Sequence, residues 1–152
     1  MATNPRLTFR WFYAFGDSGD YDVFTKWCAG HEVEALPIEY LPARGIVICQ
    51  EDVPVAMLWV YYDDSTPVCF AERAITCPGL SMEVAARAIC FAVEIAKDCA
   101  IRIGYDLMLA RVPKAMARYA IGRLGFEIEE QEVINLCFRL VRKEDLCPGS
   151  LQ

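Results

Sequence analysis

The segment Ser81–Cys99, SMEVAARAICFAVEIAKDC, is the part of this chain that decides its fold. Small and apolar residues recur along it at helical spacing, and its polar side is limited mainly to Arg87, Glu94, Lys97 and Asp98. A helix with so narrow a polar side should be largely buried. Ser81 stands where an N-cap residue is expected. We therefore predict a buried helix from Ser81 to about Cys99.

The region before this helix predicts strands and turns. Residues 7–13 alternate apolar and polar side chains as a first strand does, and the Gly-Asp-Ser-Gly-Asp sequence of residues 16–20 breaks it. Asp20 is predicted to cap a short helix that runs through Trp27 and Cys28. Pro37 and Pro42 bracket a loop or an irregular strand.

Three further strands are predicted before the buried helix. They are Gly45–Gln50, Val55–Tyr62 and Val68–Cys77, joined by turns over residues 51–54 and 63–67. β-branched and aromatic residues dominate these segments, and Asp, Pro and Ser fill the turns. The pattern indicates an antiparallel meander.

The region after the buried helix predicts one strand, one helix and a final strand or hairpin. The strand covers Ile101–Val112, the helix runs from Pro113 to about Leu124 with Gly125 to stop it, and the last strand or hairpin covers Glu127–Val141. A strand–helix–strand unit after a meander implies an α/β (α+β) fold, with a mixed, mostly antiparallel sheet of about 6–7 strands and helices on both faces. The absence of a linker or repeat indicates a single domain over residues 1–152.

Composition restricts the function classes. The 152 residues are 55% hydrophobic and 24% charged, which predicts a folded domain. A formal net charge of −6, without a long run of Lys or Arg, argues against nucleic acid or an anionic membrane as a partner. The first residues lack the pattern of a secretory signal and no apolar run is long enough to span a bilayer, so we expect a cytoplasmic protein.

Cysteine is frequent in this chain, with eight residues, but no two are spaced as C-x-x-C. Most stand inside apolar segments, where free cysteine behaves as a small hydrophobe. Because His31 is the only histidine, we predict no metal site, and we expect His31 to lie in a loop or at the surface.

Residues 123–126 and 96–103 form two short stretches that resemble the Gcn5-related N-acetyltransferase family. Arg123-Leu124-Gly125-Phe126 looks like the family's common ending of its last helix in Leu-Gly-Phe. Ala96-Lys97-Asp98-Cys99-Ala100, followed by Ile101-Arg102-Ile103, looks like the end of its central helix and the strand after it. The order of the elements is similar as well, and the resemblance is concentrated in residues 45–141.

The resemblance implies a site for acetyl-CoA or another acyl-CoA. The backbone of Ile75, Thr76 and Cys77 would pair with the pantetheine arm, and Ser81, Met82, Glu83, Val84 and Ala85 would face the pyrophosphate. In the family a glycine-rich loop and the positive helix end cradle the pyrophosphate. Here Ala85 fits the last small position, but Leu80 replaces the basic or amide residue and Glu83 replaces the first glycine. The carboxylate of Glu83 stabilises an empty helix start and would repel a phosphate.

The resemblance also suggests catalytic residues. Glu72 resembles acidic residues that some family members use to deprotonate the acceptor amine, although it is also compatible with an ordinary exposed glutamate beside Arg73. The family's tyrosine acid aligns with Ile121, and a shifted register would bring Tyr119 to that position.

Two functions remain open at the level of sequence. The first is an N-acyltransferase that acts on a small-molecule or protein amine. The second is an inactive interaction or structural module with the same fold, of the kind found among phage and prophage proteins. The aromatic stretches Phe9–Tyr13 and Trp59–Tyr62 could line a ligand groove, but sheet packing explains them better. Where they are uncovered, they would contact a protein partner or a second copy of the chain.

Overall fold

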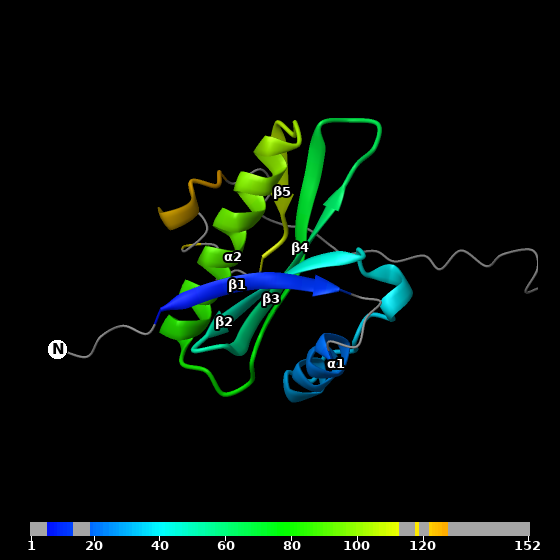
Figure 1. Cartoon of the computed structure of the whole chain (residues 1–152). Coiled ribbons are helices and arrows are strands. Elements are labelled where there is room, and N and C mark those ends of the chain that lie inside the picture. Colours follow the sequence, from blue (N-terminus) through cyan, green and yellow to red (C-terminus); the bar gives the residue numbers. More distant parts are fainter. Residues whose placement is uncertain (1–5, 14–18, 113–117, 119–121, 128–152) are drawn as a thin grey trace, which may run out of the picture.

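A computed structural model describes residues 6–13, 19–112, 118 and 122–127 of the chain. Within these residues the protein forms a five-stranded sheet in the order β1-β2-β3-β4-β5 (Figure 1). The strands are β1 (Leu7–Tyr13), β2 (Arg44–Gln50), β3 (Val53–Tyr62), β4 (Val68–Thr76) and β5 (Leu107–Ala110). The helices are α1 (Asp20–Gly30), the short 3-10 helix η1 (Ile38–Tyr40) and α2 (Met82–Arg102). The first four strands are antiparallel neighbours and β5 runs parallel to β4, which confirms the predicted mixed, mostly antiparallel α/β fold.

The two long helices cover opposite faces of the sheet (Figure 1). On one face, buried alanines of α2 at positions 88, 92, 96 and 100 recur every four residues and pack against β2, β3 and β4. On the other face, Phe24, Trp27 and Cys28 of α1 pack against Phe12 and Trp59 of the sheet. We call these two faces the α2 side and the α1 side of the sheet.

Helix α2 begins as predicted and ends later. The Ser81 side chain accepts a hydrogen bond from the Val84 N–H at 3.3 Å, which confirms the predicted N-cap. The helix continues to Arg102, beyond the predicted end at Cys99, and Gly104 then turns the chain with a φ of 92°. The strand predicted from Ile101 therefore starts only at Leu107. The apolar run 101–103 suggested a strand, but Ile101 and Ile103 form the exposed end of the helix and the turn after it.

The hairpin between β2 and β3 is tighter than predicted. Glu51 and Asp52 both have positive φ and form the turn, so Val53 and Pro54 belong to β3 and not to the turn. Pro54 pairs with Cys49 of β2, and the β3–β4 ladder begins only at Ala56. Proline fits here because this part of β3 lies outside the ladder with β4.

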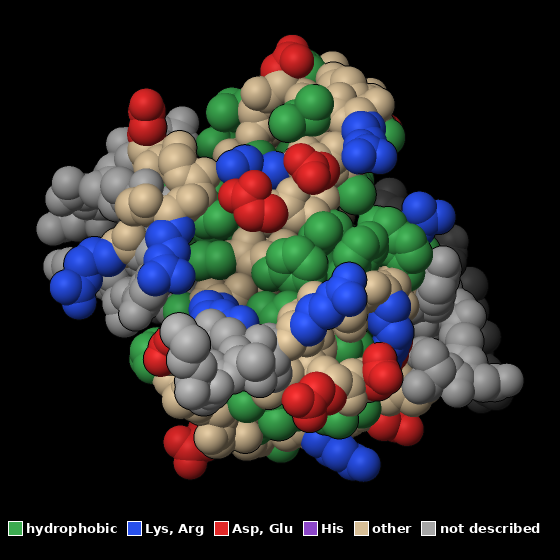
Figure 2. Space-filling view, turned by 60° about the vertical axis from the view of Figure 1, so that its left-hand side comes forward, with side chains coloured by type: hydrophobic (Ala, Val, Ile, Leu, Met, Phe, Trp, Pro, Cys, Tyr) green, Lys and Arg blue, Asp and Glu red, His purple; other side chains and the backbone are tan. Residues whose placement is uncertain are grey.

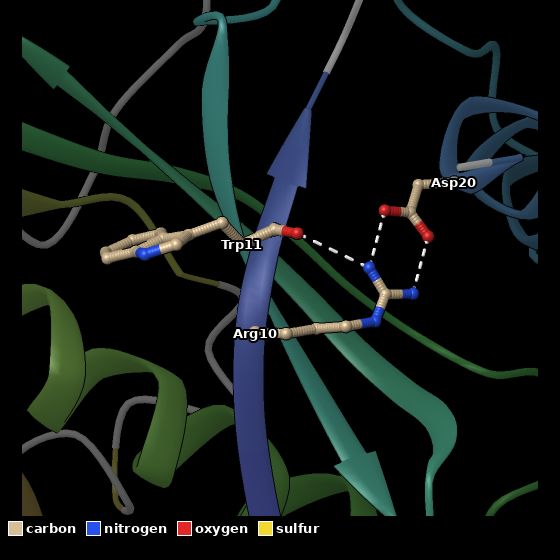
Figure 3. A network of polar contacts seen from close by, with 3 residues as sticks. All are labelled: Arg10, Trp11 and Asp20. Atoms are coloured by element: carbon tan, nitrogen blue, oxygen red, sulfur yellow. Dashed lines mark hydrogen bonds and ion pairs between the residues drawn. The ribbon is translucent and has the colours of Figure 1, made fainter. Parts of the chain in front are cut away.

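Helix α1 does not use Asp20 as its N-cap. Gly19 occupies the cap position, and Asp20 is the first helical residue, with only 2% of its surface exposed. The Arg10 guanidinium donates two hydrogen bonds of 2.7 Å to the Asp20 carboxylate and one of 3.4 Å to the Trp11 carbonyl (Figure 3). The carboxylate thus joins the start of α1 to β1.

The segment around Leu124 supports the predicted end of the last helix. Residues 122–124 are helical, and Gly125 follows with a φ of 71°. Leu124 and Phe126 pack in the α2-side core, and the Leu124 carbonyl accepts a hydrogen bond from Lys97. Most of the helix predicted from Pro113 and nearly all of the strand predicted over 127–141 lie outside the described residues. The sheet of the described residues has five strands, whereas the element order predicted about 6–7 for the whole chain.

Cysteine fills the core among the described residues. Cys28, Cys49 and Cys69 are buried free thiols, and burial raises the pKa of each. The described part of the chain contains no cluster of three or more His, Cys, Asp or Glu residues placed to bind a metal ion. Of the helices in this part, none has the length and apolar character needed to cross a membrane.

Candidate functional site

The site lies along β4, where β4 continues past the end of β5. The two strands pair from Val68 with Leu107 to Ala71 with Ala110, and β5 ends there. Glu72, Ile75 and Thr76 of β4 remain paired with β3, but no described strand pairs with the other edge of residues 72–76. Backbone groups on this edge are therefore open to a ligand, among the residues that the structure describes.

A β-bulge interrupts β4 at this point. Glu72 lies opposite Trp59 and Ile75 lies opposite Met57, so Arg73 and Ala74 together face the single residue Leu58. Arg73 has a φ of 58°, a backbone conformation that favours glycine and costs other residues about 1–3 kcal/mol. Bulges often redirect side chains beside functional sites.

The bulge places two charged side chains on the same side of the sheet. Glu72 shares a face with its partner Trp59, which belongs to the α1-side core. Burial raises the pKa of the Tyr61 phenol on this side, while the charge of Arg73 opposes that shift and the charge of Glu72 adds to it. Burial raises the pKa of the Cys28 thiol of α1, and the charge of Arg73 partly offsets this increase. Glu72 and Arg73 therefore both lie near Tyr61, although they are consecutive in a strand.

Glu72, the candidate general base, has a second basic neighbour. The Arg111 Nη1 atom, just after β5, lies 3.9 Å from the Glu72 Oε1 atom. The Glu72 side chain is partly exposed, at 28%, and Arg111 is more exposed, at 58%. A carboxylate in this setting can accept a proton from a ligand that approaches the open edge of β4.

The predicted pantetheine-binding residues lie at the end of β4. Ile75 and Cys77 pack their side chains toward the α1-side core. The Cys77 N–H donates to the Val55 carbonyl at 2.9 Å, so the Thr76 carbonyl, in the same peptide, points away from β3. The His31 Nε2 atom lies 2.8 Å from this carbonyl oxygen. His31 is exposed, as predicted, and it occupies one of the backbone acceptors assigned to a ligand.

The predicted pyrophosphate-binding residues lie at the start of α2. Ser81, Met82 and Glu83 are exposed, and Val84 and Ala85 are half-buried. The Val84 N–H is already bonded to Ser81, and the Ala85 N–H donates to the Ser81 carbonyl at 3.0 Å. This helix start therefore satisfies part of its own hydrogen-bonding capacity, and it carries the Glu83 carboxylate in its first turn.

The remaining catalytic candidate cannot be placed beside Glu72. Tyr119 and Ile121 both lie outside the described residues. The proposed role of Tyr119 as general acid therefore stays a prediction.

A row of aromatic residues lies partly uncovered on the α2 side of the sheet. The rings of Phe9 and Trp11 are 5.7 Å apart, and the Arg44 guanidinium lies 5.2 Å from the Trp11 ring. Partial burial raises the pKa of Tyr62 to about 12, against an opposing effect of Arg44, and its ring is 4.8 Å from that of Tyr105. Figure 2 shows hydrophobic side chains gathered in the middle of a face on this side of the molecule, with acidic and basic side chains around them. We call the four aromatic residues Phe9, Trp11, Tyr62 and Tyr105 the aromatic row.

The comparison with solved structures identifies the architecture. An aminoglycoside acetyltransferase from an uncultured soil metagenomic sample, in complex with trehalose, superimposes with a TM-score of 0.63 at 14% identity, over 89% of this chain and 97% of that chain. The chain has the Gcn5-related N-acetyltransferase fold. An aminoglycoside N-acetyltransferase in complex with CoA has a TM-score of 0.54 and 18% identity, over 92% of this chain and 99% of that chain. A ribosomal-protein-alanine N-acetyltransferase from Brucella melitensis biovar Abortus 2308 has a TM-score of 0.57 and 10% identity, over 90% and 100%.

Sequence comparisons give no counterpart to these structural matches. No protein-family model matches the chain, and no curated protein matches it by sequence. The similarity to this acetyltransferase fold therefore lies in the arrangement of the elements.

Several residues of the site were not predicted to belong to it. Arg73 was considered only as a reason to interpret Glu72 as an ordinary surface residue, and Arg111 was not singled out. Tyr61 was considered only as a member of the aromatic stretch Trp59–Tyr62, without a link to Glu72. Only pairing and backbone torsion reveal that Arg73 sits in a bulge. A charged Glu-Arg pair inside an otherwise apolar strand was the available signal in the sequence.

Proposed function

We propose that this protein is an N-acyltransferase that transfers an acyl group from acetyl-CoA or another acyl-CoA to an amine. The observation that carries the proposal is that β4 extends beyond β5 and presents Glu72 at the point of divergence. The fold similarity to acetyltransferases, one of them in complex with CoA, supports it.

The proposed roles follow the position of each group along β4. Glu72 would accept a proton from the acceptor amine, and Tyr119 would act as the general acid. The open edge of residues 72–76 would bind the amide groups of the pantetheine arm, as one strand binds another. The bound acyl-CoA would supply the acyl group.

The residues present fit the two ends of the cofactor unequally. The β4 edge suits an extended ligand, although the Thr76 carbonyl is already bonded to His31. The start of α2 suits a pyrophosphate poorly, because Ser81 caps it and Glu83 adds a negative charge. We therefore expect weak binding of acetyl-CoA.

Calorimetric titration of the full chain with acetyl-CoA tests this proposal. We expect measurable binding, and absence of heat at millimolar ligand would refute the proposal. Glu83→Ala removes only the repelling charge, and Glu83→Gly also permits closer approach of the phosphate to the backbone. Both should tighten binding, with the glycine variant the tighter of the two.

A second candidate function is a non-catalytic interaction module that self-associates. The aromatic row favours it, because Phe9 and Tyr62 are exposed and large exposed aromatic groups often mark interfaces. The row begins on β1, an edge strand in the described sheet, and a second copy of β1 can pair with such an edge. Sedimentation of the wild type and of Phe9→Ser tests this function. A wild-type monomer at all concentrations would refute it, and dimers lost in Phe9→Ser would support it.

A further inference from the structure

The charges around Glu72 bear on the kind of amine that the site accepts. Glu72 and Arg73 are neighbours in sequence and, because of the bulge, neighbours on the α1 side of the sheet. One group is an anion and the other a cation. A ligand that carries an ammonium group and a carboxylate close together would match both.

Arg73 is available to bind such a ligand. Its side chain is exposed, and it hydrogen-bonds the Tyr61 phenol but takes part in no ion pair within the described residues. A guanidinium has five N–H donors, so donors remain for a carboxylate. The Glu72 carboxylate already has Arg111 at 3.9 Å, so Arg73 adds positive charge to this side of the site beyond what balances Glu72. Arginine is well suited to a carboxylate because its planar guanidinium donates parallel hydrogen bonds.

The backbone of the bulge at Arg73 adds to this argument. A residue with a φ of 58° at a bulge would normally be glycine, so arginine keeps this position at a conformational cost. Strained backbone conformations of this kind are frequent at binding and catalytic sites.

We propose that the site accepts an amine that also carries a carboxylate, such as an α-amino acid, with the ammonium group beside Glu72 and the carboxylate on Arg73. This inference rests on the proposed function. Phe70 lies two residues before Glu72 on the same face, with 36% of its surface exposed, so an apolar side chain on the ligand can pack there. The proposal separates this chain from its structural neighbours that act on aminoglycosides, whose amines are polycations.

The test compares ligands that differ only in the carboxylate. The full chain is titrated calorimetrically, without any acyl-CoA, with phenylalanine, leucine and the α-amide of each, and with kanamycin as a polycationic amine. We expect each amino acid to bind at least about tenfold more tightly than its amide, the ratio that one charge-assisted contact of about 1.4 kcal/mol produces. Equal affinities for acid and amide, tighter binding of kanamycin, or no binding of either amino acid would overturn the proposal.

Three variants locate the contact. Arg73→Gly removes the guanidinium and suits the positive φ, so it should fold at least as stably as the wild type and lose the preference for the carboxylate. Arg111→Gln, at an exposed position, should weaken binding less than Arg73→Gly does. Arg102→Gln at the exposed end of α2 controls for net charge and should bind as the wild type does. Unchanged selectivity in Arg73→Gly would overturn the proposal.

The two proposals fail in distinguishable ways. Because the amine titrations contain no acyl-CoA, their outcome does not depend on cofactor binding. Binding of acetyl-CoA without preference for carboxylate-bearing amines would overturn this inference alone. Absence of acetyl-CoA binding beside a clear preference for amino acids would overturn the acyltransferase function and keep the ligand class.

Discussion

The ion pair between Arg10 and Asp20 predicts that removal of one partner destabilises the protein more than removal of the other. Two hydrogen bonds of 2.7 Å join the groups, but Asp20 is only 2% exposed while the Arg10 side chain is 43% exposed. Removal of either partner breaks both of these hydrogen bonds, and Arg10→Met also breaks the weaker 3.4 Å bond to the Trp11 carbonyl. The free-energy cost should nevertheless differ, because the group left behind is solvated in one case and buried in the other.

The magnitudes follow from these exposures. Asp20→Asn leaves a guanidinium that water can reach, so the loss of charged hydrogen bonds and of a carboxylate in the first helical turn should cost about 2 kcal/mol of unfolding free energy. Arg10→Met keeps the apolar stem but leaves the buried carboxylate without its guanidinium partner. Since breaking a buried pair costs about 3–5 kcal/mol and this pair is partly exposed, we expect about 3 kcal/mol.

Urea denaturation measures both costs, with tryptophan fluorescence as the signal. Trp27 and Trp59 lie in the α1-side core, so their emission reports on the packing of α1 against the sheet. The double variant should cost less than the sum of the single variants, because the partners interact directly. If Asp20→Asn costs as much as Arg10→Met or more, the argument from burial is wrong.

Three further predictions concern packing, the hairpin turn and catalysis. A Cβ atom at Gly45 would lie 2.5 Å from the Nε1 atom of buried Trp59, so Gly45→Ala should lower the unfolding free energy, measured by urea denaturation, by about 1–3 kcal/mol. Gly122→Ala is the control, because Gly122 has open space around it and the substitution should not lower stability. Hydrogen bonds from the Ser65 side chain and from the backbone of Ser65 and Thr66 hold the pKa of Asp63 below its usual value. The stability that Asp63 contributes should therefore be present above its unfolded-state pKa and be lost as pH falls through its folded-state pKa, and denaturation of Asp63→Asn over the same pH range should lack this part of the pH dependence. Glu72→Gln should lower kcat for acetyl transfer by about 10²–10⁴-fold at neutral pH while acetyl-CoA affinity stays unchanged, and unchanged turnover would show that another group is the base.

The sequence predicted most of the fold because its elements carry local signals. Alternation in β1, the β-branched run of β2, and the apolar spacing behind Ser81 each reflect the surface that the element buries. The errors lie at the ends of the elements, because tertiary contacts determine where an element begins and ends. Asp20 pairs with Arg10 and does not cap α1, and α2 ends at Arg102, three residues after the predicted Cys99.

The site was less predictable from sequence than the fold. Glu72 was identified as a candidate, but the neighbours that define its surroundings come from a bulge and from the residue after β5. Which strand positions share a face depends on register, and a single inserted residue reverses it. Likewise, the contact between His31 and Thr76 joins positions far apart in the chain and has no signal in either segment.

Acetyl-CoA affinity, measured by calorimetry on the full-length wild type and on Glu83→Gly, tests the central claim most directly. The account predicts weak binding to the wild type and tighter binding to the variant, because the β4 edge is open and the carboxylate at the start of α2 opposes the phosphates. Absence of binding to both proteins at millimolar acetyl-CoA would contradict it.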